Sequence, residues 1–175
     1  MVRDMSPRAI RLAALAAVVA AAWLGWSWWH STERRIYRRL DALTSRLEKH
    51  GSESALAAAA DAHGVLDFFA PGFIIRARPY ENELRDPQEL MGAVMRFRGG
   101  AGRIDVEISD RHLTLGADER SGELVFLAAV TLDRGAGSGR ESWRVRSLWI
   151  EDGDEWRIAE LELLQRVEGG AGLGF

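Results

Sequence analysis

His63 and Asp67 are the residues whose types and spacing best suit acid–base chemistry. They lie in an Ala-rich segment that we expect to be helical, so Asp67 could reach the His63 imidazole across one turn. An Asp that fixes a His tautomer is the arrangement that a general base requires. Because His63 shares a helical stripe with Leu56, Ala59 and Leu66, we expect it to face inward. A hydrogen-bonded core histidine is the alternative interpretation of the same pattern.

Charged residues also recur on two predicted strands near the end of the chain. Arg144 and Arg146 share one face of their strand, and Glu160 and Glu162 share one face of the next. Such ladders predict cross-strand ion pairs on a solvent-exposed or dimer-forming face. If a ladder pointed into the interior instead, a buried carboxylate could have a raised pKa and act as an acid or base.

Several classes of site are excluded by composition. The chain has no cysteine, so it has no disulfide, thiolate nucleophile or Cys-ligated metal. The four histidines, at positions 30, 50, 63 and 112, lack the spacing of metal-ligand motifs, so we expect neither a metal nor another cofactor. A net charge of −3 with interspersed basic residues also argues against nucleic acid as a partner.

Residues 12–31 are predicted to form a transmembrane helix or signal anchor. No residue between Leu12 and Trp29 is charged, and at about 1.5 Å rise per residue this run approaches the thickness of a bilayer core. Tryptophans and arginines are typical of the membrane interface. The predicted membrane-interface residues are Arg11, Trp23, Trp26, Trp28, Trp29, Arg34, Arg35, Arg38 and Arg39.

A cleaved signal peptide is the alternative interpretation of this segment, since Ala20 to Ala22 offers small residues for cleavage. It would leave a mature chain that starts in a cluster of exposed tryptophans, so we favour the anchor. We expect a bacterial inner-membrane protein with its domain in the periplasm, although the flanking arginines nearly balance and fix the orientation only weakly.

The rest of the chain predicts an α+β domain over residues 32–167, between a short flank (1–11) plus the anchor and a flexible tail (168–175). Apolar spacing predicts helices from about 32 to 50 and from Ser52 towards Pro71, and Asp86 with Pro87 predicts the start of a third. From Arg103 on, alternating residues and turn-rich connections predict an antiparallel meander of about four strands. Helices packed on one face of a curved antiparallel sheet would form a cone-shaped domain.

The last predicted strand contains a conflict of periodicity. Trp156 and Ile158 have one parity, whereas Leu161 and Leu163 have the other, so a regular pleat cannot bury all four on one side. We predict a β-bulge near Ala159, which would bend the sheet. A strand that is covered on both faces is the alternative.

The order of these elements and the ending Gly153, Trp156, Arg157, Ile158 resemble the nuclear transport factor 2-like superfamily, with its SnoaL-like and ketosteroid-isomerase-like members. The resemblance implies a curved sheet, a cone-shaped pocket and frequent homodimers formed through the sheet. It transfers no catalytic residue, because neither Tyr37 nor Tyr80 matches the isomerase pattern. Fold alone does not assign a function.

From these observations we expect a membrane-anchored module that binds a protein partner, its own copy or a small apolar ligand. One alternative is an isomerase, dehydratase or hydrolase that uses His63 and Asp67 in the cone pocket. Another is a structural or assembly factor of an envelope complex. Convergence of His63 with an acid in the interior would favour the enzyme.

Overall fold

The computed structural model describes residues 31–77, 80–134 and 137–167. They hold three helices, α2 (Thr32–Leu47), α3 (Ala55–Leu66) and α4 (Pro87–Gly99). Within these ranges, none of the helices has the length and apolarity that a membrane crossing requires. The flank, nearly all of the predicted transmembrane segment and the tail at 168–175 lie outside the described residues.

The predicted start of α4 at Asp86 and Pro87 is confirmed, whereas α3 begins at Ala55, later than the predicted start at Ser52. The Ser54 hydroxyl accepts a hydrogen bond from the Ala57 amide at the start of α3, and the Asp86 carboxylate accepts two from the amides at the start of α4. Pro87 follows at the first helical position, where its missing amide costs no hydrogen bond. The predicted apolar stripe of α2 is confirmed, since Ile36, Leu40 and Leu43 are buried.

The described residues form one seven-stranded sheet with the order β1-β4-β5-β6-β7-β2-β3. The strands are β1 (Lys49–His50), β2 (Phe69–Ala77), β3 (Tyr80–Leu84), β4 (Arg103–Leu115), β5 (Ser121–Asp133), β6 (Ser138–Asp152) and β7 (Glu155–Val167). The predicted meander is confirmed, because β4, β5, β6 and β7 pair antiparallel in sequence order.

The prediction of a purely antiparallel sheet is wrong at one pair of strands. β2 lies parallel to β7, with Ile75 opposite Leu161 and Arg76 opposite Glu162. A parallel pair needs a crossover connection, and the segment from β3 through α4 and the meander supplies one. This pairing brings together residues that are more than eighty positions apart in the sequence.

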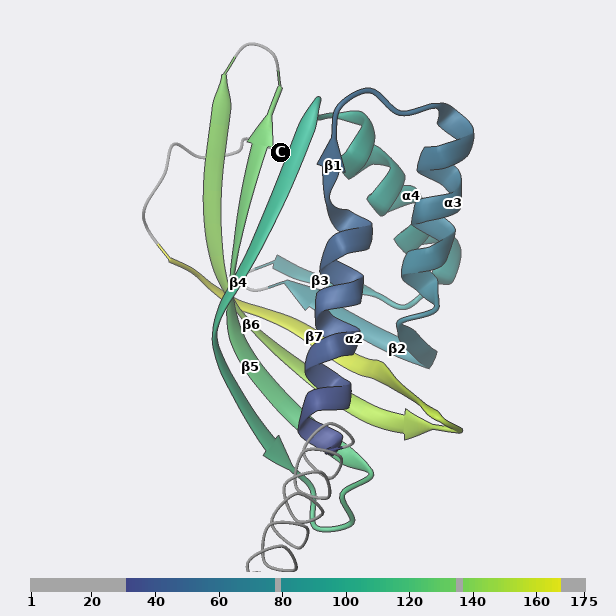
Figure 1. Cartoon of the computed structure of the whole chain (residues 1–175), viewed down its shortest axis with the longest axis vertical. Helices are drawn as coiled ribbons and strands as arrows, with labels where there is room; N and C mark the ends of the chain where they lie inside the picture. The colour runs from purple at the N-terminus through teal and green to yellow at the C-terminus, as the bar shows by residue number, and fades with distance from the viewer. Residues whose placement is uncertain (1–30, 78–79, 135–136, 168–175) are drawn as a thin grey trace, which may run out of the picture. The chain divides into compact units, whose positions relative to one another are not determined.

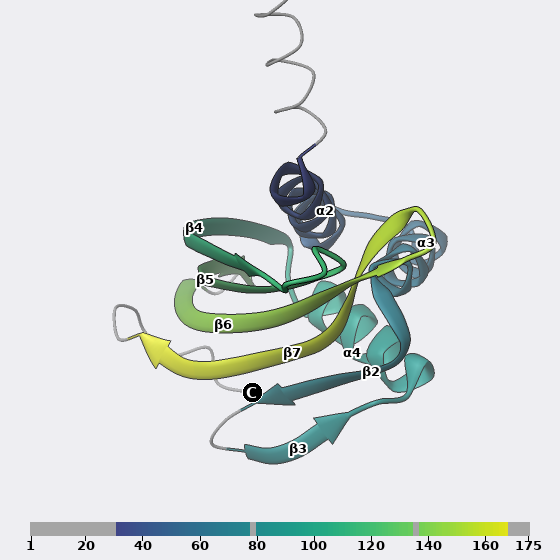
Figure 2. The same cartoon turned by 90° about the horizontal axis from the view of Figure 1, so that it is seen from below.

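All three helices lie on one face of the curved sheet, as Figures 1 and 2 show. We call this the inner face, and it carries Leu124, Phe126, Val145, Trp149 and Ile158, all buried in the core with side chains of the helices. The opposite face, which no described helix covers, is called the outer face. Trp149 is fully buried and anchors this face in the core.

The predicted β-bulge at Ala159 is confirmed. Ile158 pairs with Trp149 but Glu160 pairs with Leu148, so Ala159 is the extra residue in β7. After the bulge, Leu161 and Leu163 pair with Ser147 and Val145 and therefore lie on the inner face with Trp156 and Ile158. The same shift places Glu160 and Glu162 on the outer face.

Arg98, near the end of α4, is a buried charge that the sequence did not mark. Its side chain is 2% exposed and donates to Glu53, to Asp61 and to the carbonyls of Arg46 and Glu48. Lys49 caps the same end of α4 by donating to the carbonyls of Arg98 and Ala101. Together these bonds tie the ends of α2, α3 and α4 to one another.

Candidate functional site

The predicted acid–base pair does not lie in the interior. His63 and Asp67 are both exposed, whereas Ala62 and Val65 are the buried residues of α3. The prediction that His63 faces inward is therefore wrong. Alanines surround α3 on every side, so the apolar pattern did not determine which face packs on the domain.

The two side chains of the predicted pair also do not contact each other through a hydrogen bond. No hydrogen bond between the His63 imidazole and the Asp67 carboxylate is present in the described part of the chain. The backbone carbonyl of Asp67 instead accepts a hydrogen bond from Arg39. A catalytic role for His63 and Asp67 stays a prediction without support from this geometry.

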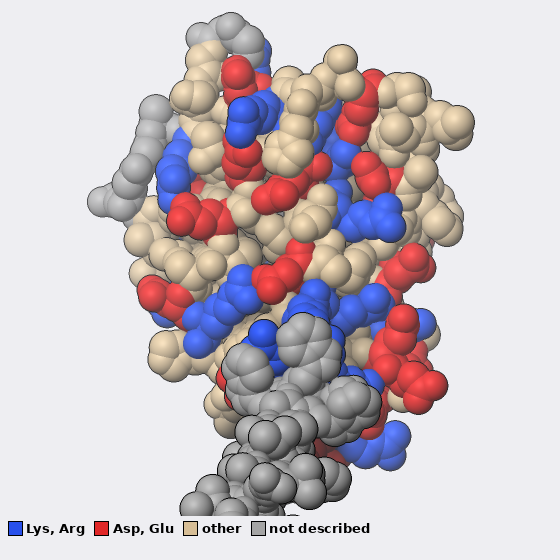
Figure 3. Space-filling view, viewed as in Figure 1, with Lys and Arg blue, Asp and Glu red and all other residues tan. Residues whose placement is uncertain are grey.

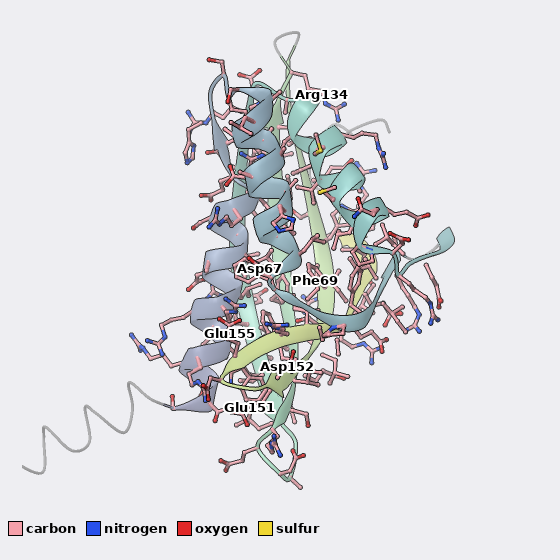
Figure 4. The ribbon with its side chains drawn as sticks, turned by 90° about the vertical axis from the view of Figure 1, so that its right-hand side faces the viewer. Asp67, Phe69, Arg134, Glu151, Asp152 and Glu155 are labelled. Carbon is pink, nitrogen blue, oxygen red and sulfur yellow. The ribbon has the colours of Figure 1, made fainter. Side chains whose placement is uncertain are left out.

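Arg39 was predicted to lie at a membrane interface, but its guanidinium contacts the domain itself. It donates to the carbonyls of Trp156 and Asp67, pairs with Glu155 at 3.0 Å, and lies over the Phe68 ring. Figure 4 shows Asp67 and Glu155, the residues that it joins. Arg39 therefore holds α2 against the β6–β7 hairpin, and membrane contact by the predicted interface residues stays a prediction.

The inner face of β6 carries a buried carboxylate. Glu141 of β6 is buried, and it accepts hydrogen bonds from Arg166 at 3.0 Å and from the indole of Trp143 at 3.4 Å. Trp143, two residues along β6 from Glu141, is only half-buried, although it packs against the core. Leu163 and Leu161, opposite Val145 and Ser147 further along the same face, are half-buried as well. This end of the inner face thus combines aromatic and aliphatic surface with a carboxylate.

The outer face carries the predicted charge ladders. Arg146 of β6 donates to Glu162 of β7 at 2.6 Å and lies 3.5 Å from both Glu160 and Glu123. Asp105 and Glu107 of β4 share this face, and Glu107 pairs with Arg140. The prediction of cross-strand ion pairs is confirmed, and the alternative, in which Glu160 or Glu162 points into the interior, is wrong.

The ion pairs continue across β7 into the parallel strand. Arg76 of β2 pairs with Glu160 and, at 2.7 Å, with Glu83 of β3, which also binds Arg85. We call the seven residues of this set the outer ion network: Arg76, Glu83, Arg85, Glu123, Arg146, Glu160 and Glu162. Sequence analysis missed Arg76 and Glu83 because only the parallel pairing of β2 with β7 brings them here.

The ion network shifts the titration of its members. The hydrogen bond from Arg76 lowers the pKa of Glu83, and a second bond from Arg85 adds to the effect. The hydrogen bond to Glu162 raises the pKa of Arg146, as the bond to Glu83 does for Arg76. Each shift favours the charged form, so these groups stay ionised at neutral pH.

A pocket opens on the outer face inside this network. Glu123, Arg146, Leu148 and Glu160 line it, and its volume is about 60 Å³, enough for about four to six water molecules. Leu148 is 36% exposed and is one of the few large apolar side chains on the described surface that water reaches to this extent. The pocket therefore has one apolar wall and carboxylates on two sides.

Elsewhere, charge is distributed without a dominant sign. On the face drawn in Figure 3, Lys and Arg are interspersed with Asp and Glu. Among the described residues, no group of three His, Asp or Glu side chains converges as a metal site would require.

Comparison with known proteins places the fold. The sequence matches no protein-family model, and no curated protein matches it. A candidate scytalone dehydratase from Novosphingobium aromaticivorans aligns over 82% of this chain and 93% of its own, with a TM-score of 0.63 and 9% identity. A nuclear transport factor 2-like protein with a cystatin-like fold from the same organism aligns over 94% and 92%, with a TM-score of 0.60 and 11% identity.

The domain has the nuclear transport factor 2-like fold. A candidate calcium/calmodulin-dependent protein kinase II association domain from Xanthomonas campestris also shares it, with a TM-score of 0.59, 16% identity, and coverage of 75% of this chain and 86% of that one. At such identities the likeness concerns the nuclear transport factor 2-like fold alone, since this fold supports unrelated functions.

Proposed function

We propose that the domain is an interaction module that associates with a second copy of itself through the outer face of its sheet. The observation that carries this proposal is the pocket at Leu148 inside the outer ion network. It combines an exposed apolar side chain with ordered charges of both signs on a face that no described helix covers.

A second copy fits this surface because the surface is self-complementary. In a two-fold dimer the same patch meets itself, so it must carry both donors and acceptors. The outer face of β6 and β7 does so, with Arg144 and Arg146 on one strand and Glu160 and Glu162 on the next. The Xanthomonas neighbour is itself named for association, which agrees with this use of the fold.

The test compares two exposed leucines. Full-length chains that carry two different tags are co-expressed, solubilised in mild detergent, and purified through one tag. We expect the wild-type chains to co-purify and Leu148→Asp to reduce co-purification at least tenfold, because the carboxylate would be desolvated at the interface. Leu56→Asp is the control, since Leu56 is 81% exposed on α3 and its substitution should change nothing.

Sedimentation of the same samples gives the stoichiometry. A monomeric wild-type chain, or equal behaviour of the two aspartate variants, would refute association through the outer face.

A small apolar ligand on the inner face is the second candidate function. The half-buried indole of Trp143, bonded to the carboxylate of Glu141, supports it, because binding sites combine apolar surface with a few polar groups. Half-buried Leu163 and Leu161 extend this apolar surface along the inner face. An isomerase, dehydratase or hydrolase has less support, since His63 and Asp67 lie on the solvent side of α3. Tethering of the module to a bacterial inner membrane by residues 12–31 completes the proposal.

A further inference from the structure

Arg144 is a charged residue of the outer face that does not belong to the outer ion network. Arg144 lies on β6 two positions before Arg146 and pairs in register with Leu127 of β5, so it points to the same side of the sheet. Among the described residues, no carboxylate makes an ion pair with Arg144. Its side chain is half-buried. Within the described part of the chain, Arg144 thus presents a positive charge without a carboxylate partner beside side chains that form ion pairs.

The outer ion network around the pocket, in contrast, has more negative than positive groups. The outer ion network contains four carboxylates and three guanidinium groups, so one negative charge is left over. Arg146 is held closest to Glu162, at 2.6 Å, while Glu123 and Glu160 are each 3.5 Å away from it. Glu160 is also bound by Arg76, so Glu123 is the carboxylate of the pocket that its partners satisfy least.

Building on the proposed self-association, we infer that Arg144 of one copy inserts into the pocket of the other and pairs with Glu123 and Glu160. The stem of the arginine would pack on Leu148, as long cationic side chains do on apolar surface. The contact is reciprocal, because a two-fold axis makes each copy both donor and acceptor.

The spacing along β6 fits this arrangement. Arg144, Arg146 and Leu148 alternate on one face, so each step covers about 6.7 Å. A two-fold axis at Arg146 places Arg144 of one copy opposite Leu148 of the other, across a gap of about 10 Å between packed sheets. The two Arg146 side chains then meet near the axis, where Glu162 of the same chain neutralises each one.

A charge exchange tests the inference with full-length chains. In the co-purification assay, we expect Arg144→Glu alone and Glu123→Lys alone to reduce self-association at least tenfold, since each puts like charges together. Co-expression of the Arg144→Glu chain with the Glu123→Lys chain should restore co-purification to near the wild-type level. In that mixed dimer both contacts again join opposite charges, and recovery also shows that both variants fold.

Each outcome separates the two proposals. If the wild-type chains do not co-purify, self-association through the outer face fails and the inference fails with it. If they co-purify while Arg144→Glu has no effect, or if the mixed pair is not restored, the Arg144 contact is refuted and self-association stands. Arg103→Glu, the same change at an exposed arginine of β4, must leave co-purification intact; an equal loss would show an effect of net charge and overturn the inference.

Discussion

Arg98 joins the end of α4 to the end of α2 and to α3. A buried guanidinium is tolerated because Glu53 and Asp61 supply charge and two backbone carbonyls accept its remaining protons. If the arginine were removed, Glu53 would keep only Lys49, at 3.8 Å, as a cationic neighbour. The stability of this corner therefore depends on one side chain.

Arg98→Met should lower the free energy of unfolding by about 3 kcal/mol, because the partly buried carboxylates of Glu53 and Asp61 lose the guanidinium that they share. Arg120→Met is the matched control. Arg120 is an exposed arginine with a single partner, Glu151, at 3.4 Å, and its loss should cost about 0 to 1 kcal/mol. Urea-dependent proteolysis of the full chain in mild detergent measures both, and equal midpoints for the two variants would contradict a role for Arg98 in stability.

The bulge in β7 acts at the scale of an element, because it reverses which side chains face inward. Before Ala159, Trp156 and Ile158 face the helices. After it, Leu161 and Leu163 do so. The same residue thereby assigns Glu160 and Glu162 to the outer ion network. One extra residue thus positions both the core and the candidate interface.

Deletion of Ala159 should abolish stable folding. Without the bulge, Leu161 and Leu163 would turn outward and the two glutamates inward, and the lost apolar burial alone is about 3 kcal/mol or more. Ala159→Gly keeps the chain length and should cost about 1 kcal/mol or less. Near-ultraviolet circular dichroism and resistance to protease distinguish the two, and a well-folded deletion variant would show that the bulge does not set the register.

At the scale of the whole molecule, the sequence predicts a domain attached to a membrane. The full chain should remain with vesicles after a high-salt or carbonate wash, because about twenty apolar residues insert in the bilayer. A chain that begins at Ser31 keeps the described domain and should be released into the supernatant. Fractionation with immunodetection measures this, and release of the full chain by salt would refute the anchor.

The sequence by itself determined the local features of this protein. Asp86 and Pro87 located the start of α4, alternation located the meander, and the change of parity at Ala159 located the bulge, because each depends only on neighbouring residues. The pairing of Arg146 with Glu160 and Glu162 was also predictable, since one short turn joins their strands.

Only the tertiary structure decided the contacts between distant segments. The parallel pairing of β2 with β7 brought Arg76 and Glu83 into the outer ion network, and the packing of α3 turned His63 towards solvent. An alanine-rich helix has no polar face to fix its rotation, and a parallel pair has no turn to mark it. Which charges lie together on the outer face is therefore a property of the folded sheet.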